Sequence, residues 1–320
     1  MVQSQTMSNP SPLAKKPWHV RLQKTLRRYW PVYALFIPCL VCLIIFSYAP
    51  MYGVVLAFKD FKSRLGILGS PWADPLFKHF EALFGDPYFL KVMRNTVVIS
   101  VLRLAVGFPA PLILALLLNE LRGQRFKRTV QTIFYLPNFI SWVILGSMFK
   151  SVLGVDGLLD TFLSKFGLSA PPFFSNDFWF IILLLFTEVW KSMGFASIIY
   201  MAAIAGVDQT QYEAATLDGA TRFQKMRYIT IPGISGAIFI QLIMSLSGIL
   251  SAGFDQIFQM YSPVVYDWAD IIDTYVYRIG VGGGNYEVAT ALGLFKSVVG
   301  LVLIYITNKI INKLGGEGIW

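Results

Sequence analysis

Residues 208–232 read DQTQYEAATLDGATRFQKMRYITIP, a largely polar stretch between two long apolar runs. Thr210 and Glu213 have the spacing of a capping box, in which a hydroxyl and a carboxylate satisfy the first free amides of a helix. The pattern therefore predicts a short helix that begins at Gln211 and continues through small alanine side chains.

The second half of this stretch predicts another short helix. Gly219 stands where a residue with left-handed backbone would end the first helix. Thr221 and Gln224 repeat the capping-box spacing, and the helix that they open has to stop before Pro232. The expected result is two short helices joined by a glycine bend. Because small side chains allow close approach of another backbone, we expect this loop to dock a partner protein.

Outward from this loop, the chain is too apolar for a soluble protein. Hydrophobic residues make up 55% and charged residues 14% of its 320 residues, whereas soluble domains are about 45–50% apolar. Six segments are apolar enough to cross a bilayer, which takes about 20 residues each. These predicted spans are 33–58, 95–118, 130–149, 178–205, 234–253 and 288–311. The sequence thus predicts an all-α integral membrane protein with six transmembrane helices.

The distribution of basic residues predicts the orientation of the chain. The net charge of +9 is spread over short connections rather than gathered on one face with aromatic side chains, so no nucleic-acid partner is expected. Lys and Arg are more numerous in the two terminal tails and in 119–128 and 206–233 than in the other connections. This bias marks the cytoplasmic side, so both termini are predicted to be cytoplasmic. The first span lacks a small-residue cleavage site and is predicted to stay as an uncleaved helix.

Part of the polar loop resembles a known family motif. Six of its residues, two of them acidic and four small, carry the resemblance: Glu213, Ala214, Ala215, Asp218, Gly219 and Ala220. With the segment ITIP at 229–232, they resemble the EAA loop of type I ABC import permeases. Met226 and Ile231 depart from the family pattern, which often has Phe and Leu there, but both remain apolar.

The resemblance implies the type I ABC importer permease fold with a cytoplasmic coupling helix. In that family two permease chains, commonly non-identical, form a cavity that opens alternately to each side of the bacterial cytoplasmic membrane. A soluble binding protein delivers the substrate from outside, and two ATP-binding subunits close on ATP from inside. The coupling helix seats in a cleft of an ATP-binding subunit. The six residues would then be the ATPase-coupling residues.

The same resemblance implies which subunits hydrolyse ATP and how this chain is organised. No GxxxxGK[ST] phosphate loop occurs in the sequence, so this chain is expected to be a non-catalytic permease that binds no cofactor, with ATP and Mg on partner subunits. The expected organisation is an N-terminal cytoplasmic tail over 1–29, a permease domain over 30–314 with its EAA loop at about 208–232, and a C-terminal tail over 315–320.

Two flanking segments indicate the substrate class. Residues 50–60 and 285–296 resemble the oligosaccharide and polysaccharide branch of these permeases, and the whole chain is similar to permeases of alginate-type importers. Arg103, Lys191 and Lys296 would offer carboxylate partners to an acidic oligosaccharide within the membrane.

Polar side chains inside membrane spans are costly, so each one marks a candidate functional position. The candidates for the substrate pathway are Asn138, Glu188, Trp190, Lys191 and Gln241. Glu188 and Lys191 are three residues apart on one helical face, so they either pair with each other or contact sugar or act in gating. Trp190 either packs against neighbouring helices or stacks on a sugar ring.

Two other classes of function compete with this interpretation. An ion-gradient-driven secondary transporter would use intramembrane charges such as Glu188 for coupling, but it leaves the capped helix pair without a role. A membrane enzyme would need an acidic cluster, and Asp267, Asp270 and Asp273 form an external acidic patch. Because no paired motif accompanies them, we expect a solvated loop instead. Neither the two cysteines nor the two histidines have metal-ligand spacing, so no metal site is predicted.

Overall fold

The computed structural model describes residues 18–121 and 123–313, and most of these residues are helical, with no strand among them. The predicted C-terminal tail over 315–320 and the first part of the predicted N-terminal tail, 1–17, lie outside the described residues. The chain divides into two compact units, Met1–Val54 and Val55–Trp320.

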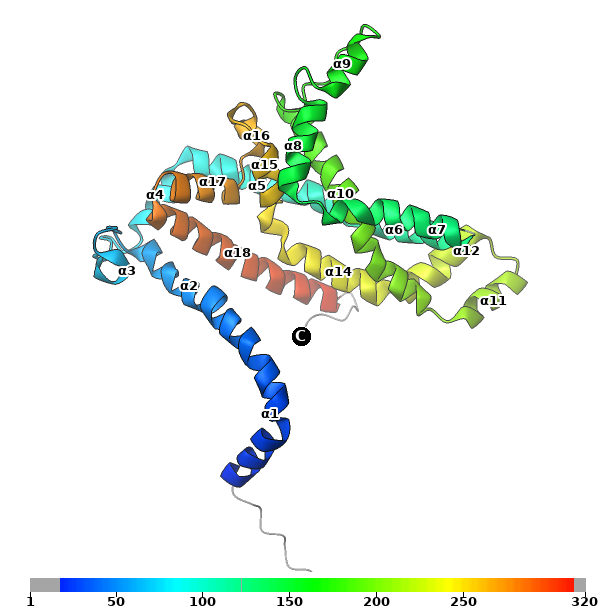
Figure 1. Cartoon of the computed structure of the whole chain (residues 1–320), viewed down its shortest axis with the longest axis horizontal. Coiled ribbons are helices and arrows are strands. Elements are labelled where there is room, and N and C mark those ends of the chain that lie inside the picture. Colours follow the sequence, from blue (N-terminus) through cyan, green and yellow to red (C-terminus); the bar gives the residue numbers. More distant parts are fainter. Residues whose placement is uncertain (1–17, 122, 314–320) are drawn as a thin grey trace, which may run out of the picture. The chain divides into compact units, whose positions relative to one another are not determined.

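The first unit contains one long helix, drawn in blue in Figure 1. Helix α1 (Trp18–Leu43) continues through a π-helical turn (Ile44–Tyr48) into α2 (Ala49–Met51). Together with the following 3-10 turn, it gives an apolar helix over Arg27–Phe58 that is long enough to span a membrane. The predicted first span at 33–58 is therefore confirmed as a helix, and it extends back into the predicted tail as far as Trp18.

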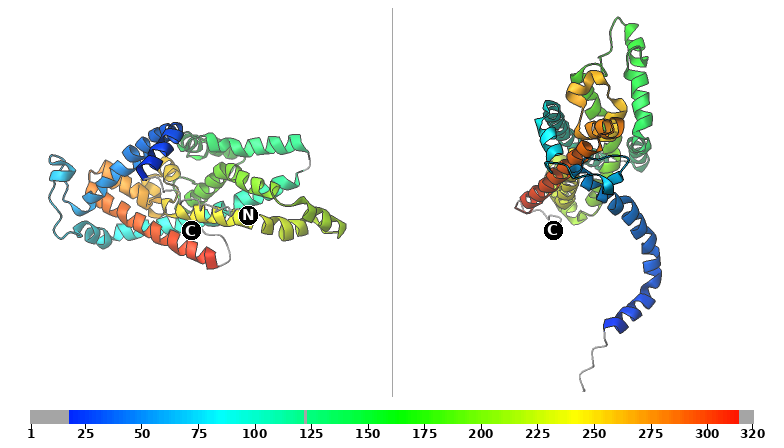
Figure 2. Two further views of the ribbon diagram at one scale, coloured as in Figure 1. Left: turned by 90° about the horizontal axis from the view of Figure 1, so that it is seen from below. Right: turned by 90° about the vertical axis from the view of Figure 1, so that its left-hand side faces the viewer.

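In the second unit, long apolar helices pack side by side. Helices α5 (Pro87–Gly107) and α6 (Pro109–Glu120) form one candidate span, because proline at the start of α6 takes a position where its missing amide costs no helical hydrogen bond. Helix α10 (Asp177–Ala205) packs on both. Helix α18 (Tyr286–Lys313) packs against α14 (Ser235–Ser247), as the left view of Figure 2 shows.

The predicted third span, 130–149, is wrong in its bounds because the backbone breaks within it. Helix α7 (Gln124–Tyr135) ends before a 3-10 turn (Leu136–Phe139) that contains a proline, and α8 (Trp142–Leu153) starts again after it. Proline lacks the amide that would continue the helix, and the side chain of Ser141 caps the new one by accepting from the Ile144 amide. The apolar helix that could span a membrane here is Trp142–Ser164.

The predicted fifth span, 234–253, is wrong in its bounds, because it matches only the second half of a bent pair of helices and runs on into the turn that follows α14. The segment Arg222–Gly233 meets Ser235–Leu246 at an angle of 64°. Among the described residues, five helices are long and apolar enough to cross a membrane, and this pair makes a sixth if it counts as one span. The fold class predicted from the sequence, an all-α membrane protein with six spans, is confirmed.

The remaining connections hold short helices. Helix α9 (Leu158–Ser164) follows α8, and α11 (Gln209–Leu217) and α12 (Arg222–Lys225) lie between α10 and α14. The others are α3 (Gly66–Gly69), α4 (Lys78–Gly85), α13 (Ile231–Gly233), α15 (Phe254–Met260), α16 (Tyr266–Ala269) and α17 (Ile272–Tyr277).

The predicted solvated acidic patch is wrong for Asp270 and Asp273, whereas Asp267 is exposed; all three carboxylates are paired within the chain. Asp270 is fully buried and forms a bidentate ion pair with Arg278, with nitrogen to oxygen distances of 2.5 and 3.1 Å. Asp273 accepts from Lys296 at 2.6 Å, and Asp267 pairs with Lys91. A buried carboxylate needs such a partner. The pair of Asp273 with Lys296 joins α17 to α18, while the exposed Asp267 still presents charge to solvent.

Candidate functional site

Helix α11 begins two residues earlier than the sequence predicted, and the predicted capping box at Thr210 and Glu213 is wrong. Asp208 is the cap: its carboxylate accepts from the Thr210 amide at 2.9 Å and from the Thr210 hydroxyl at 2.8 Å. An aspartate is as good a cap as a threonine, and here it turns the threonine hydroxyl into a donor. The same hydrogen bonds, first that from the amide, lower the pKa of Asp208 below its ordinary value.

The end of α11 and the start of α12 agree with the sequence prediction. Gly219 has a φ of +76°, the Ala220 amide donates to the Ala215 carbonyl at 2.9 Å, and the Gly219 amide donates to Thr216 at 3.1 Å. This is a Schellman ending, which requires left-handed backbone at the glycine. Thr221 and Gln224 form the predicted capping box in full.

The inner face of α11 is anchored to the spans. The hydroxyl groups of Tyr212 and Thr230 are 2.8 Å apart, and Lys225 donates to the Thr216 hydroxyl at 2.7 Å. Tyr212 also packs against a buried cluster that includes Tyr200 from α10. These contacts join α11 to α10 and to the segment that leads into α14.

The outer face of α11 is uncovered. Glu213, Ala214, Asp218 and Gly219 are exposed, whereas the other two predicted coupling residues, Ala215 and Ala220, are half-buried. Leu217, on the same short helix, is 90% exposed. Figure 1 shows α11 at one extremity of the second unit, beyond the ends of the long helices. We call Glu213, Leu217 and Asp218 the outer α11 surface; it presents one exposed leucine between two carboxylates.

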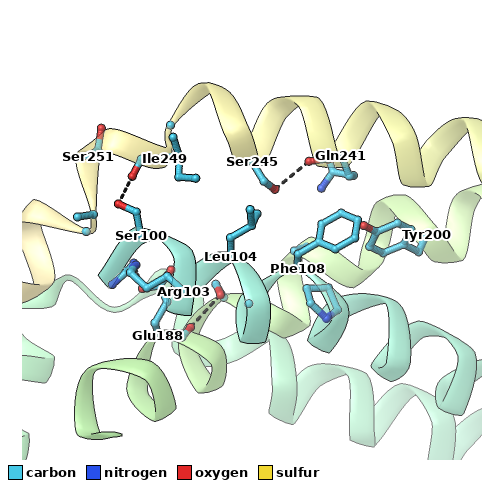
Figure 3. A pocket seen from close by; sticks show the side chains of 17 residues that line it. Ser100, Arg103, Leu104, Phe108, Glu188, Tyr200, Gln241, Ser245, Ile249 and Ser251 are labelled. Carbon is cyan, nitrogen blue, oxygen red and sulfur yellow. Dashed lines mark hydrogen bonds and ion pairs between the residues drawn. The ribbon is translucent and has the colours of Figure 1, made fainter. Parts of the chain in front are cut away.

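A cavity of about 400 Å³ lies among α5, α6, α10, α14 and the turn that follows α14 (Figure 3). Its walls combine apolar side chains with hydroxyl, amide and charged groups, and they include two of the five predicted pathway residues, Glu188 and Gln241. Asn138, Trp190 and Lys191 are not among its lining residues.

A charged network crosses one end of this cavity. Arg103 pairs with Glu188 at 2.8 Å and also donates to the side chain of Gln256. Gln256 is fully buried and donates in turn to the Leu184 carbonyl at 2.8 Å and the Thr187 hydroxyl at 2.7 Å. The predicted pairing of Glu188 with Lys191 is therefore wrong: the carboxylate takes a partner from another helix.

Lys191 instead compensates for the break in the third predicted span. Its ammonium group donates to the carbonyls of Asn138 at 2.9 Å and Ile140 at 2.7 Å, and it lies 5.5 Å from the centroid of the Trp142 ring. Carbonyls freed by a helix break at membrane depth need a donor from the protein. Trp190 packs edge to face on Phe149, with ring centroids 5.9 Å apart, as the packing interpretation predicted.

Two residues of this site were missed in the sequence. Gly253 has a φ of +84°, and a Cβ atom there would lie 2.2 Å from a guanidinium nitrogen of Arg103. Only glycine therefore allows the arginine to occupy its place. The glycine was visible at the end of the predicted fifth span, but its role depends on a residue 150 positions away, as does that of Gln256.

Aromatic rings continue from Gly253 along α15. Phe254 stacks on Phe258 with centroids 5.3 Å apart, Phe258 lies 6.1 Å from Tyr261, and Tyr261 lies 5.0 Å from Tyr266. We call these four rings the aromatic row. Burial, followed by the hydrogen bond with Tyr266, raises the pKa of Tyr261 to about 12. The spacing of the first three rings is that of one helical face, a signal that the sequence offered.

The chain is similar to known proteins over most of its length. Residues 107–314 match the family model described as binding-protein-dependent transport system inner membrane component. The polygalacturonan/rhamnogalacturonan transport system permease protein YteP of Bacillus subtilis (strain 168) is 41% identical, over 96% of this chain and 95% of its own length. Protein LplB of the same organism is 42% identical, over 92% of each chain.

Solved structures agree with this match. A chain in the crystal structure of a bacterial ABC transporter involved in the import of the acidic polysaccharide alginate has a TM-score of 0.83 and 39% identity, over 92% of this chain and 99% of that chain. A chain from the alginate transporter in complex with an alginate pentasaccharide-bound periplasmic protein has a TM-score of 0.84 and 38% identity, over 93% of this chain and 100% of that chain.

Proposed function

Because the chain belongs to the family of binding-protein-dependent transport system inner membrane components, we propose that it forms half of the translocation pathway for an oligosaccharide and is driven by a separate ATPase through α11. The chain is a permease of a binding-protein-dependent ABC sugar importer, a multi-pass protein of the inner membrane and not an enzyme. The proposal concerns how the chain is coupled to ATP hydrolysis, which substrate it carries and with which partner subunits it assembles.

The coupling part of the proposal rests on α11. Its outer surface, with Leu217 90% exposed between Glu213 and Asp218, docks an ATP-binding subunit. When the ATP-binding subunit moves, the inner face of α11 transmits that movement to the spans through the hydrogen bonds of Tyr212 and Lys225. The proposal places α11 and both termini on the cytoplasmic side of the membrane, as the distribution of basic residues predicts.

The substrate part of the proposal rests on the cavity and the aromatic row. A sugar presents hydroxyl groups at its rim and C–H groups on its faces, so it suits polar walls next to aromatic rings. The aromatic row leads to the turn at Gly253, where the cavity begins. Two relatives carry polygalacturonan or rhamnogalacturonan and alginate, according to their names, which favours a uronic-acid oligosaccharide here.

An acidic substrate would meet cations that already have partners. Arg103 is held by Glu188 and Gln256, Lys191 by backbone carbonyls, and Lys296 by Asp273. Of these, only Arg103 lines the cavity, so it is the group that would exchange its carboxylate partner for that of a passing uronic acid. Such an exchange keeps binding weak, which a transport pathway requires because the substrate has to leave again.

The proposed assembly contains this chain, a second homologous permease, two ATP-binding subunits that carry ATP and Mg, and an extracytoplasmic solute-binding protein. One of the similar structures contains a sugar-loaded periplasmic protein, which supports the last of these partners. Alternating access then requires that the loaded binding protein and ATP favour one state of the permease pair over the other.

Uptake into proteoliposomes tests this proposal. The chain, co-purified with its partner subunits, should accumulate trigalacturonate only when the solute-binding protein is outside and ATP is inside, and should exclude maltotriose of similar length. Imposed proton or sodium gradients without ATP should give no uptake. Gradient-driven uptake would instead favour a secondary transporter, and equal uptake of maltotriose would contradict the acidic substrate class.

A further inference from the structure

A second cavity, of about 440 Å³, lies beside the inner face of α11 and away from the substrate cavity. It is enclosed by the end of α6, the start of α7, the end of α10 and the segment from α11 to the π-helical turn at Met226–Thr230. Its walls share no residue with the cavity that contains Arg103 and Glu188.

The charges around this second cavity are predominantly positive. Lys127, Arg222 and Lys225 line it, and Glu120 is the only carboxylate among its lining residues. Arg222 lies 3.9 Å from Glu120, at the limit of an ion pair. Lys225 donates to the hydroxyl of Thr216 rather than to an anion. Three cations facing one carboxylate leave the cavity with an excess of positive charge.

Lys127 is the least satisfied of these cations. It is half-buried, and its ammonium group has no hydrogen bond or ion pair with any residue whose side chain the structure describes. Holding an ammonium group partly out of water without a partner is unfavourable. Tyr212 and Thr230 also line the cavity, but their hydroxyl groups bond to each other, so the three cations are the donors that an oxyanion would meet there.

The helix that carries Lys127 has the character of a membrane-surface helix. Helix α7 reads QRFKRTVQTIFY, with basic residues in its first half and exposed apolar side chains at Phe126 and Ile133. Such helices lie at the boundary between headgroups and acyl chains. Basic pockets between membrane helices are the sites where anionic phospholipid headgroups bind.

We propose that this cavity binds a phosphate group, held by Lys127, Arg222 and Lys225, and that the phosphate belongs to an anionic phospholipid or to a soluble phosphate. The bound phosphate would take Lys225 away from Thr216 and so loosen one of the two hydrogen bonds that anchor α11. The occupancy of the cavity would thus adjust the coupling loop. The phosphate site itself does not depend on the substrate or on the ATPase partner, whereas its effect on coupling rests on the proposed function of α11.

Native mass spectrometry of the intact, purified assembly tests the proposal, with phosphatidylglycerol as the probe and phosphatidylcholine as the neutral reference. The wild-type assembly should retain phosphatidylglycerol in preference to phosphatidylcholine. Lys127→Gln should weaken that binding roughly five-fold, the factor expected for losing one basic contact near an anionic group. Lys127→Arg keeps the charge and should restore binding, which separates the loss of the site from a folding defect.

Arg128→Gln is the matched control, because Arg128 is exposed on the same helix, does not line the cavity and carries the same charge. It should leave phosphatidylglycerol binding unchanged. Displacement of the lipid by millimolar inorganic phosphate would identify the source as soluble, and resistance to displacement would identify it as lipid. Equal loss in Lys127→Gln and Arg128→Gln, or equal retention of phosphatidylcholine, would overturn the phosphate site.

Discussion

Glu213→Lys should reduce ATP-driven uptake at least about ten-fold, because reversing a charge at a docking surface places like charges in contact and costs several kcal/mol. The glutamate is exposed on the outer α11 surface, and among the described residues its side chain makes no hydrogen bond that holds the helix. Since Asp208 is the cap, the substitution leaves the start of α11 intact. The expected phenotype is therefore loss of uptake with a folded chain, measured in proteoliposomes beside the thermal unfolding midpoint of the assembly.

Gln211→Lys is the control for this prediction. Gln211 is also exposed on α11, but it lies two residues earlier and points to a different side of the helix. The same positive charge there should change uptake little. Comparable losses in both variants would mean that the overall charge of the loop, rather than the outer α11 surface, governs uptake.

Glu188→Gln should destabilise the chain by about 2–3 kcal/mol, because it leaves the largely buried guanidinium of Arg103 without a counter-charge. The double variant Arg103→Gln/Glu188→Gln removes both charges and should recover most of that stability, although uptake of an acidic oligosaccharide should stay low. Thermal unfolding and uptake, measured for both variants, separate the structural role of the pair from its role in transport.

An exposed ion pair is the control for that measurement. Lys78 lies 2.9 Å from Asp60 at the surface, with 49% of its side chain accessible. Such pairs contribute little to stability, so Lys78→Gln should leave the unfolding midpoint unchanged. If the double variant at Arg103 and Glu188 is no more stable than Glu188→Gln, the unpaired charge is not the cause of the loss.

The sequence predicted features that depend on local pattern. Apolar runs of span length located the helices, and the spacing of Thr221 and Gln224 located the start of α12, because both signals need only neighbouring residues. Gly219 ended α11 as expected, since left-handed backbone is a local demand of the helix end. The role of the six coupling residues remains a prediction.

Features that depend on tertiary contacts were missed. Glu188 and Lys191 share a helical face, but each finds a better partner across the bundle: a guanidinium on α5 and carbonyls released near Pro137. The spacing within one helix contains no information on those partners. The break in the predicted third span was missed because a proline inside an apolar run is compatible with a kinked helix as well as with an interruption. Asp208 was passed over because two good caps stand within three residues of each other.

Site-directed cross-linking at Leu217 tests most directly whether α11 docks an ATP-binding subunit. The two native cysteines are first replaced by Cys39→Ser and Cys42→Ser, and Leu217→Cys then provides the single thiol for a bifunctional thiol–amine reagent. Val155→Cys in the same background is the control, because Val155 is 83% exposed in a predicted external connection. The account predicts a covalent adduct with the ATP-binding subunit from position 217 and none from position 155. The absence of an adduct at 217 in an assembly that still transports, or equal adducts from both positions, would contradict it.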